Sequence, residues 1–374
     1  MTDGAVTQPA RTASTGRDPI KPLFLRDTAH GGPADQLAQV STALCDFVAA
    51  AEQTLDIAIY DFRLHDPASE GPVVAALLAA AQRGVSVRIG YDAGKPTDAR
   101  AEDFARLQAD PAPVGTGDWL TQHFAATSVQ CQPIQAGGQL MHSKYLVRDA
   151  ATPSATVWTG STNFTDDAWT RQENNIITVA NRTMARAFTQ DFQQMWTSGR
   201  INGAGAQLAD SKSGVSWDFC PGDGAAINTA LAKHITDAKE SLVIAAMVLT
   251  SHEVLAALAQ AIENGISLTG IYDGGQMDPI VRQWQQSGNT TVLKNWRTVS
   301  ARLAHKQSTP YSPTGLHDFM HLKVLVADDS VITGSYNFSA NAEKNAENQI
   351  RTTDAQTVSE YRTFLAAVIA AYQP

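Results

Sequence analysis

The 374-residue chain repeats one order of segments in its two halves. Each half has an apolar strand, an alanine-rich helix and a second strand, at 54–62, 72–82 and 83–94 in the first and at 241–249, 254–263 and 264–275 in the second. Gly84 matches Gly265 and Asp92 matches Asp273 at the same offset. An internal repeat of this size restricts the fold to two similar units that share an interface.

Strands separated by helical segments favour an α/β fold with parallel crossover units and a largely buried sheet. A further helical stretch precedes the first strand of each half, at 34–51 and 225–238. Between the halves, the sequence is rich in Gly, Ser and Ala, as is typical of an exposed connector. We therefore predict four parts, which are a flexible arm at 1–22, a first repeat at 23–197, a linker at 198–214 and a second repeat at 215–374.

Each half also carries a short motif of polar and charged residues. The first reads MHSKYLVRD and the second MHLKVLVAD, and each is followed by a Gly-Ser-x-Asn turn and then by a Glu-Asn pair. The residues of the first set are His142, Lys144, Asp149, Gly160, Ser161, Asn163 and Glu173. Those of the second set are His321, Lys323, Asp328, Gly334, Ser335, Asn337 and Glu347. One such string is a weak signal, but two inside a detectable repeat indicate a functional site.

The spacing of each motif places its His and Lys on one face of a strand, because strand side chains alternate between faces. Cleavage of a phosphodiester without a metal needs a nucleophile, an acid for the leaving oxygen and fixed positive charge around the phosphate. His142 and His321 can supply the nucleophile and the acid, because imidazole titrates near neutral pH. Lys144 and Lys323 can hold the nonbridging oxygens. The two motifs therefore predict a phosphodiesterase.

The remaining motif residues are expected to support this chemistry. The turns supply short polar groups that can bind phosphate oxygens, and glycines that allow a tight backbone: Asn163, Asn337, Ser161, Ser335, Gly160 and Gly334. Glu173 and Glu347 lie in similar strings, QENNI and AENQI, and are expected to fix the tautomers of the histidines. Asp149 and Asp328 each end a strand, so we predict a structural role for them in the hairpin turn.

These strings resemble the paired HKD motifs of the phospholipase D superfamily, and the repeat covers nearly the whole chain from about Leu23 onward. FCPGDG at 219–224 also resembles the segment that opens the second half in that family. The resemblance implies a pseudo-twofold αβαβα sandwich with the active site at the interface of the repeats. It implies a covalent phosphohistidine intermediate, resolved by water or an alcohol, and neither a metal nor another cofactor. It also implies that His142 is the nucleophile and His321 the acid and base.

The motifs leave the substrate open, because the chemistry acts on the diester alone. A phospholipid is the first hypothesis, since the chain has a formal net charge of -9 and nucleic-acid binding needs clustered Lys and Arg. Nucleic acid is the alternative, because MHLKVLVADDSVITGSYNFS also resembles the motif of small bacterial nucleases of the superfamily. Transfer of the cardiolipin-synthase type is less favoured, since those relatives usually carry N-terminal membrane helices.

A zinc hydrolase is a further alternative, because His305, His317 and His321 occur close together in the sequence. It is disfavoured, since His321 lies on a predicted strand, where residues four apart do not converge as they do on a helix.

Localisation and partners follow from composition. The longest apolar run, at 73–81, is much shorter than the roughly 20 residues of a membrane span, and the first residues lack the apolar core of a secretory signal. We therefore expect a cytoplasmic, monomeric enzyme that acts on phospholipid at a membrane surface as a peripheral protein.

The insertions at 95–140 and 276–320 carry several aromatic residues, which are Trp119, Phe124, Trp284, Trp296 and Tyr311. Local packing is the favoured role for them, with shallow lipid contact by Trp119 and Trp296 as the alternative hypothesis.

Overall fold

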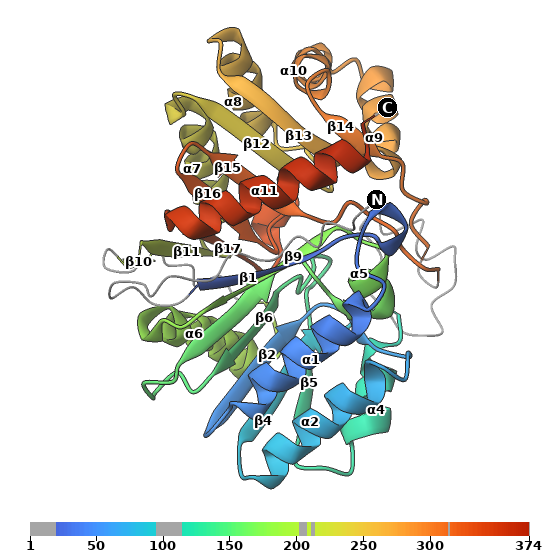
Figure 1. The fold of residues 1–374 in the computed structure, drawn as a ribbon, viewed down its shortest axis with the longest axis vertical. Helices are drawn as coiled ribbons and strands as arrows, with labels where there is room; N and C mark the ends of the chain where they lie inside the picture. The colour runs from blue at the N-terminus through green and yellow to red at the C-terminus, as the bar shows by residue number, and fades with distance from the viewer. Residues whose placement is uncertain (1–19, 95–113, 202–207, 211–213, 313–314, 374) are drawn as a thin grey trace, which may run out of the picture.

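The computed structural model describes residues 20–94, 114–201, 208–210, 214–312 and 315–373. The first half forms a seven-stranded sheet (Figure 1). Its strands are, in spatial order, β1 (Ile20–Leu25), β9 (Asn174–Val179), β7 (Thr156–Gly160), β6 (Lys144–Arg148), β2 (Thr54–Ile59), β4 (Ser86–Asp92) and β5 (Gln130–Ile134). The short strands β3 (Phe62–Arg63) and β8 (Phe164–Thr165) pair beside it.

The second half forms an eight-stranded sheet of the same design. Its strands are, in spatial order, β10 (Leu208–Asp210), β11 (Val215–Cys220), β17 (Glu347–Thr352), β16 (Ser330–Gly334), β15 (Lys323–Ala327), β12 (Ser241–Ala246), β13 (Ser267–Asp273) and β14 (Ala304–Lys306). Both sheets are mixed. The crossovers β2 to β4 and β12 to β13 are parallel, as predicted, whereas the motif strands β6 and β15 run antiparallel to β2 and β12 because each begins a hairpin.

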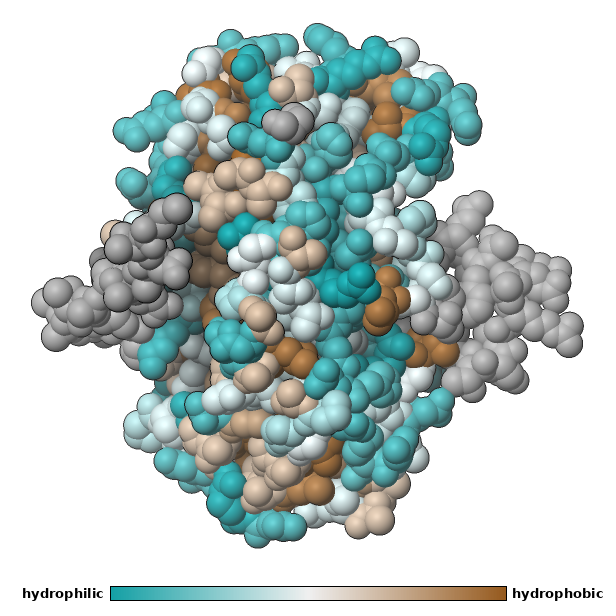
Figure 2. Space-filling view, turned by 45° about the vertical axis from the view of Figure 1, so that its right-hand side comes forward, coloured by the Kyte–Doolittle hydropathy of each residue, from teal (hydrophilic) through white to brown (hydrophobic). Residues whose placement is uncertain are grey.

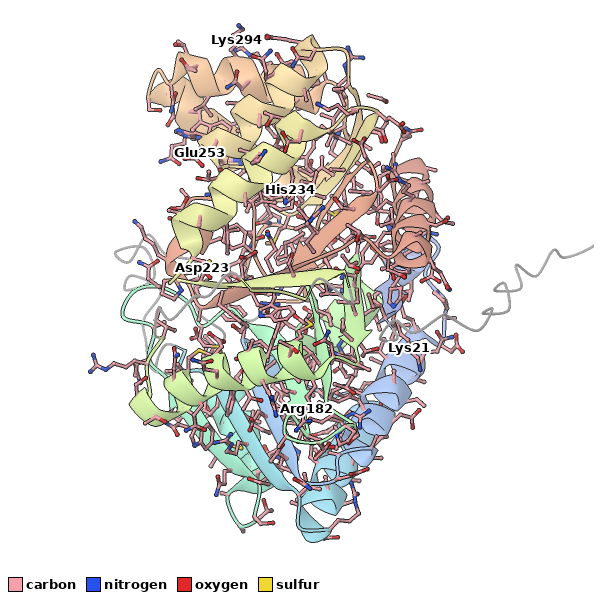
Figure 3. The ribbon with its side chains drawn as sticks, turned by 90° about the vertical axis from the view of Figure 1, so that its left-hand side faces the viewer. Lys21, Arg182, Asp223, His234, Glu253 and Lys294 are labelled. Atoms are coloured by element: carbon pink, nitrogen blue, oxygen red, sulfur yellow. The ribbon has the colours of Figure 1, made fainter. Side chains whose placement is uncertain are left out.

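Helices cover both sheets on the outside and fill the space between them. The outer helices are α1 (Gln36–Ala49), α2 (Glu70–Gln82) and α4 (Thr116–Phe124) in the first half, and α7 (Gly224–Asp237), α8 (His252–Glu263), α9 (Gly274–Gln286) and α10 (Thr290–Ser300) in the second. Figure 3 shows α7, marked by His234, and α8, marked by Glu253, side by side on the outer face of the second sheet. The middle layer consists of α6 (Arg182–Ser198) and α11 (Ala355–Ala371). The result is the expected αβαβα arrangement.

The middle helices join the two halves because each contacts both sheets. Helix α6 packs on β2, β6 and β7 and also on β11, while α11 packs on β12, β15 and β16 and also on β1. The buried stripe of α6 has helical spacing, with Met184, Phe188, Phe192 and Met195 on one face. The ring of Phe188 lies 4.8 Å from that of Phe219 in the second half. One apolar core therefore runs through the interface.

Two segments differ from the sequence-based expectation. Strand β1 begins at Ile20, inside the predicted flexible arm, because it pairs with β9 and buries Ile20 and Leu25. The predicted linker contains β10, which pairs with β11. Most of the predicted arm (1–19), part of the linker and much of the first insertion (95–113) lie outside the described residues.

The tryptophans that were candidates for lipid contact belong to the core. Trp119 is 4% exposed and Trp296 is 6% exposed, and the indole of Trp119 donates to the Leu64 carbonyl at 2.8 Å. Their proposed contact with lipid is therefore wrong, since their rings pack against the outer face of each sheet. Among the described residues, the large hydrophobic side chains that remain exposed are Tyr311 and Leu316.

The surface seen in Figure 2 mixes hydrophilic and hydrophobic residues without one extended hydrophobic area. No helix in the described parts of the chain is both long enough and apolar enough to cross a membrane.

Candidate active site

The two motif histidines lie just before β6 and β15, and each is held by the other half of the molecule. The amide of His142 donates to the Ala346 carbonyl at 2.9 Å, and the amide of His321 donates to the Glu173 carbonyl at 3.1 Å. The residue before each histidine also pairs with the opposite half. Met141 forms an isolated β-bridge with Ala346, and Met320 forms one with Glu173. The site thus forms only where the two repeats meet.

The side chains of the histidines have different partners. Nδ1 of His142 lies 2.8 Å from Oε2 of Glu347, which comes from the second half. Nδ1 of His321 lies 3.0 Å from Oδ1 of Asn174, which comes from the first half. An acceptor at Nδ1 keeps the proton there and leaves Nε2 free for chemistry. The pseudo-symmetric site therefore contains one histidine paired with a carboxylate and one paired with a neutral amide.

Glu173 was expected to mirror Glu347, and the structure places it elsewhere. Gly160 pairs with Ile176 while Gly334 pairs with Gln349, so the structural counterpart of Glu347 is Asn174. Aligning the two Glu-Asn pairs by sequence is thus wrong by one residue. Because neighbouring residues of an extended chain face opposite sides, this single step turns the Glu173 carboxylate away from the histidines.

The Glu173 carboxylate belongs to a buried ionic cluster on the other side of the chain. Its oxygens accept from Nζ of Lys306 at 2.9 Å, from Oη of Tyr372 at 2.5 Å and from the amide of Asp27 at 3.2 Å. Lys306 also binds the Asp27 carboxylate at 3.0 Å. The cluster connects β14, the C-terminal end of α11 and the segment after β1, so its place in the structure is at the interface rather than in the cleft.

Both motif lysines are fully enclosed and point back at their own motifs. Nζ of Lys144 donates to the His142 carbonyl at 2.8 Å, and Nζ of Lys323 donates to the His321 carbonyl at 2.7 Å. Nζ of Lys144 also lies 4.8 Å from the centre of the Tyr60 ring. That ring packs edge-on against the His142 imidazole at 4.8 Å, so Tyr60 helps to fix both groups.

Burial lowers the pKa values of all four groups, and neighbouring cations add to the shift at His142, His321 and Lys323. Burial lowers the pKa of His142 to about 4, although the Glu347 carboxylate opposes the shift. Burial lowers the pKa of Lys144 to about 7, again against Glu347. The pKa values of His321 and Lys323 are held well below their usual range by burial and then by neighbouring cations. A site that lowers the pKa of four cationic groups together favours an anionic ligand, which would offset the repulsion.

The Gly-Ser-x-Asn turns divide into cleft residues and packing residues. Asn163 and Asn337 line the cleft, and the side-chain oxygen of each has no hydrogen-bond partner among the described residues. Ser161 donates to Asn174 at 2.7 Å, and Ser335 accepts the Asn348 amide at 3.0 Å. Both serine side chains are completely buried. In place of the expected phosphate contact, these hydroxyls fasten the turns to β9 and β17.

Gly160 and Gly334 are required by close backbone approach. Both have φ of 150°. A Cβ at Gly160 would lie 2.1 Å from the Asn175 carbonyl oxygen, and one at Gly334 would lie 2.2 Å from that of Asn348. Any side chain at these positions would therefore push the strand that carries Asn174 or Glu347 out of place.

The aspartates that end the motifs contact backbone amides. The Asp149 carboxylate accepts from the amides of residues 52–54 at 2.7 to 3.2 Å. The Asp328 carboxylate accepts from the amides of residues 239–241 at 2.7 to 3.0 Å. Both residues have positive φ, 56° and 42°. Each carboxylate thus ties the hairpin to the start of the neighbouring strand, away from the cleft.

A second pair of aspartates, Asp92 and Asp273, was noted only as part of the repeat. Their carboxylates accept the amides of Met141 and Met320 at 2.7 and 2.8 Å, directly before the histidines. Burial raises the pKa of both to about 6. They position the start of each motif, and their equal place in the two halves was the sequence signal that pointed to them.

A cleft of about 360 Å³ opens where the halves meet, and both histidines line it. The first half contributes Tyr60, Asp61, Arg63, Leu140, Asn163, Thr165 and Gln172 to its wall, and the second half contributes Met247, Val248, Thr250, Gln276, Pro279, Ile280, Tyr311, His317, Phe319, Asn337, Ser339, Asn341 and Asn345. The cleft is therefore of a size suited to a small organic ligand, with both polar and apolar side chains on its walls.

The zinc alternative finds no ligand set in the described parts of the chain, where no three His, Cys, Asp or Glu side chains are arranged to hold a metal ion. His317 binds the Ser312 carbonyl at 2.7 Å and lies 3.5 Å from Asp167. His305 stacks on Tyr272.

Comparisons with known proteins agree with the geometry. Residues 44–196 and 231–369 match the protein family described as "Cardiolipin synthase, PLD-like domain". No match was found among curated protein sequences.

Three solved structures show how far the likeness of fold extends. Phosphatidylserine synthase from Haemophilus influenzae Rd KW20 superposes with a TM-score of 0.62 at 12% identity, over 92% of this chain and 87% of that one. Polyphosphate kinase from Porphyromonas gingivalis has a TM-score of 0.57 at 12% identity, over 94% of this chain and 50% of its own. Nuc from Salmonella typhimurium, a phospholipase D family member, has a TM-score of 0.34 at 21% identity, over 50% of this chain and 99% of its own.

Proposed function

Because the chain belongs to the phospholipase D superfamily, we propose that it removes or exchanges the head group of a phospholipid through a covalent phosphohistidine. The observation that carries this proposal is the unequal pairing of the two histidines across one cleft, with Glu347 on His142 and Asn174 on His321. The reaction needs one imidazole as the nucleophile and another as the acid and base. The different partners of His142 and His321 suit the two rings to these two roles.

The carboxylate partner favours His142 as the nucleophile. When Nε2 of His142 attacks phosphorus, the ring keeps its proton on Nδ1 and becomes positively charged, and the Glu347 carboxylate stabilises that charge. The bond from phosphorus to the head-group oxygen breaks in the same step. Lys144 and Lys323 lie beside both histidines and can balance the charge of the nonbridging oxygens, assisted by Asn163 and Asn337.

The amide partner favours His321 as the acid and base. An imidazolium beside a neutral amide is less stabilised than one beside a carboxylate, so it gives up its Nε2 proton more readily to the leaving oxygen. In the second step, neutral His321 takes a proton from water or an alcohol, whose oxygen attacks phosphorus while the bond to His142 breaks. The product is then phosphatidic acid or a new phosphodiester.

Phospholipid is favoured over nucleic acid by the lining of the cleft. Arg63 is the one arginine or lysine among the described residues that line it, and its guanidinium is paired with Asp61 at 2.7 Å. A nucleic-acid backbone would need a series of free cations along its path. A lipid also needs access from a membrane, and Leu316, which is 66% exposed, lies in the segment that supplies His317 and Phe319 to the cleft.

The test is turnover of phosphatidylcholine vesicles and single-stranded DNA side by side, with EDTA and with or without ethanol. We expect release of choline, formation of phosphatidylethanol when ethanol is present, and a loss of at least about 1,000-fold in His142→Ala. In His321→Ala the adduct should accumulate from bis(p-nitrophenyl) phosphate, whose p-nitrophenolate leaves without an acid, because the base of the second step is missing. Peptide mapping of alkali-quenched enzyme should place this adduct on residue 142. Cleavage of DNA alone would overturn the lipid assignment, and an adduct on residue 321 in wild-type enzyme would reverse the roles.

A further inference from the structure

The two walls of the cleft differ at positions that the repeat makes equivalent. Strands β2 and β12 occupy the same place in their sheets, and the residue after each donates its amide to the middle residue of a motif. Tyr60 donates to Ser143 at 3.0 Å and Met247 donates to Leu322 at 3.1 Å. Tyr60 therefore corresponds to Met247, and the next residues in line, Asp61 and Val248, correspond to each other.

The wall from the first half is polar and held rigidly. The Asp61 carboxylate accepts from Nε and a terminal nitrogen of Arg63, both at 2.7 Å, and from the Thr116 hydroxyl at 2.9 Å. Asp61 is 7% exposed, so the pair is largely shielded from water, where such an ion pair with two parallel hydrogen bonds is strongest. It presents fixed hydrogen-bonding groups of both charges to the cleft.

This polar wall continues toward His321. The charges of Asp61 and Asp167 both act on the Arg63 guanidinium, and Asp167 accepts the amide of His317 at 2.9 Å. His317 in turn stacks on Phe319, two residues before His321, with ring centres 4.8 Å apart. The polar wall therefore lies next to the segment that carries His321, the residue proposed to give its proton to the leaving oxygen.

The part of the second-half wall that is equivalent to Asp61 is apolar, whereas polar side chains such as Thr250, Asn337 and Asn341 line other parts of that wall. Met247, Val248 and Ile280 line the cleft, and Val248 and Ile280 are partly buried against the core of that half. Apolar surface that lines a cleft is stabilised when the apolar part of a ligand covers it. Nothing in the repeat requires this contrast, since Asp61 and Val248 occupy equivalent strand ends.

We infer that the cleft fixes the direction of an amphiphilic diester, with its glycerol and acyl part on Met247, Val248 and Ile280 and its polar head group on Asp61 and Arg63. This inference rests on the proposed function and goes further, because it names the side on which each end of the lipid binds. It assigns acyl-chain selectivity to the second half and head-group selectivity to the first.

The experiment places the first half's carboxylate at the equivalent position of the second half. Val248→Asp and its matched control Val248→Leu are compared with wild type on dioctanoylphosphatidylcholine in mixed micelles and on bis(p-nitrophenyl) phosphate, which has no acyl chains. We expect Val248→Asp to lower the ratio of the two kcat/KM values about tenfold or more, and Val248→Leu to keep it within about twofold. Ile280→Asp is a second variant at the same wall, for use if Val248→Asp lowers the melting temperature.

Arg63→Gln tests the head-group side of the cleft. It should change the preference between choline and glycerol head groups while the preference for acyl-chain length stays as in wild type. An unchanged ratio in both Val248→Asp and Ile280→Asp, or a loss of chain-length preference in Arg63→Gln, would overturn the inference. If wild-type enzyme cleaves bis(p-nitrophenyl) phosphate and no phospholipid, the proposed function fails and this inference fails with it.

Discussion

The two halves of the molecule share a backbone plan and differ in the side chains that meet at its centre. Each half delivers a lysine from the start of an equivalent strand and a histidine from just before it, and the side chain of each histidine is hydrogen-bonded by a residue of the opposite half. In one case the completing residue is Glu347, and in the other it is Asn174. The contrast teaches that the repeat provides a symmetric scaffold, whereas the reaction is made directional by single residues at equivalent positions.

Among the changes that test the difference between the halves, the largest expected effect comes from removing the Glu347 carboxylate. Glu347→Gln should lower kcat about 100-fold, because the positive ring formed on His142 loses its counter-charge. Glu173→Gln is the matched control, since Glu173 has the same place in the sequence motif and lies in the Lys306 cluster. It should lower the melting temperature and leave kcat within about threefold. Equal losses of kcat in the two variants would mean that the halves do not differ in the way proposed.

The pH dependence sharpens the same comparison. Lys144 is charged below its pKa of about 7, and burial holds the pKa of the acid His321 well below its usual range. The value of kcat/KM should therefore fall as pH rises toward and through 7, because the leaving oxygen loses its proton donor and the phosphate loses a cation. His142 is neutral above its pKa of about 4, so kcat/KM should also fall as pH drops below it. Because Glu347 raises both pKa values, Glu347→Gln should move both limbs to lower pH. A profile that is flat from about pH 5 to 9 would contradict these roles.

The smallest expected effect concerns stability. Asp149 is 1% exposed, whereas Asp328 is half-buried, and each accepts three neighbouring backbone amides. Asp149→Ala should lower the free energy of unfolding by about 2 to 3 kcal/mol and Asp328→Ala by about 1 kcal/mol, because unpaired amides cost more where water cannot reach them. Urea titration measures both values. Equal losses of unfolding free energy in the two variants would show that burial of the aspartate does not set how much each carboxylate stabilises the fold.

Several features of the fold and the site could be predicted from sequence because they repeat or have a fixed period. The two halves, their crossover strands and helices, and the His-x-Lys spacing follow from local patterns. The superfamily resemblance is confirmed by the match over residues 44–196 and 231–369. The pairing of Asp92 with Asp273 was also visible, although their role in holding the motif strands was not.

The sequence by itself determined that this protein consists of two α/β repeats with one His-Lys pair each. Only the tertiary structure decided which residues complete the histidines, because those contacts join residues 205 and 147 positions apart. It showed that Asn174, and not Glu173, is the counterpart of Glu347, since a one-residue step on an extended strand reverses the direction of the side chain. It also decided that Ser161, Ser335, Trp119 and Trp296 are packing residues, because burial depends on which surfaces meet in space and no local pattern records that.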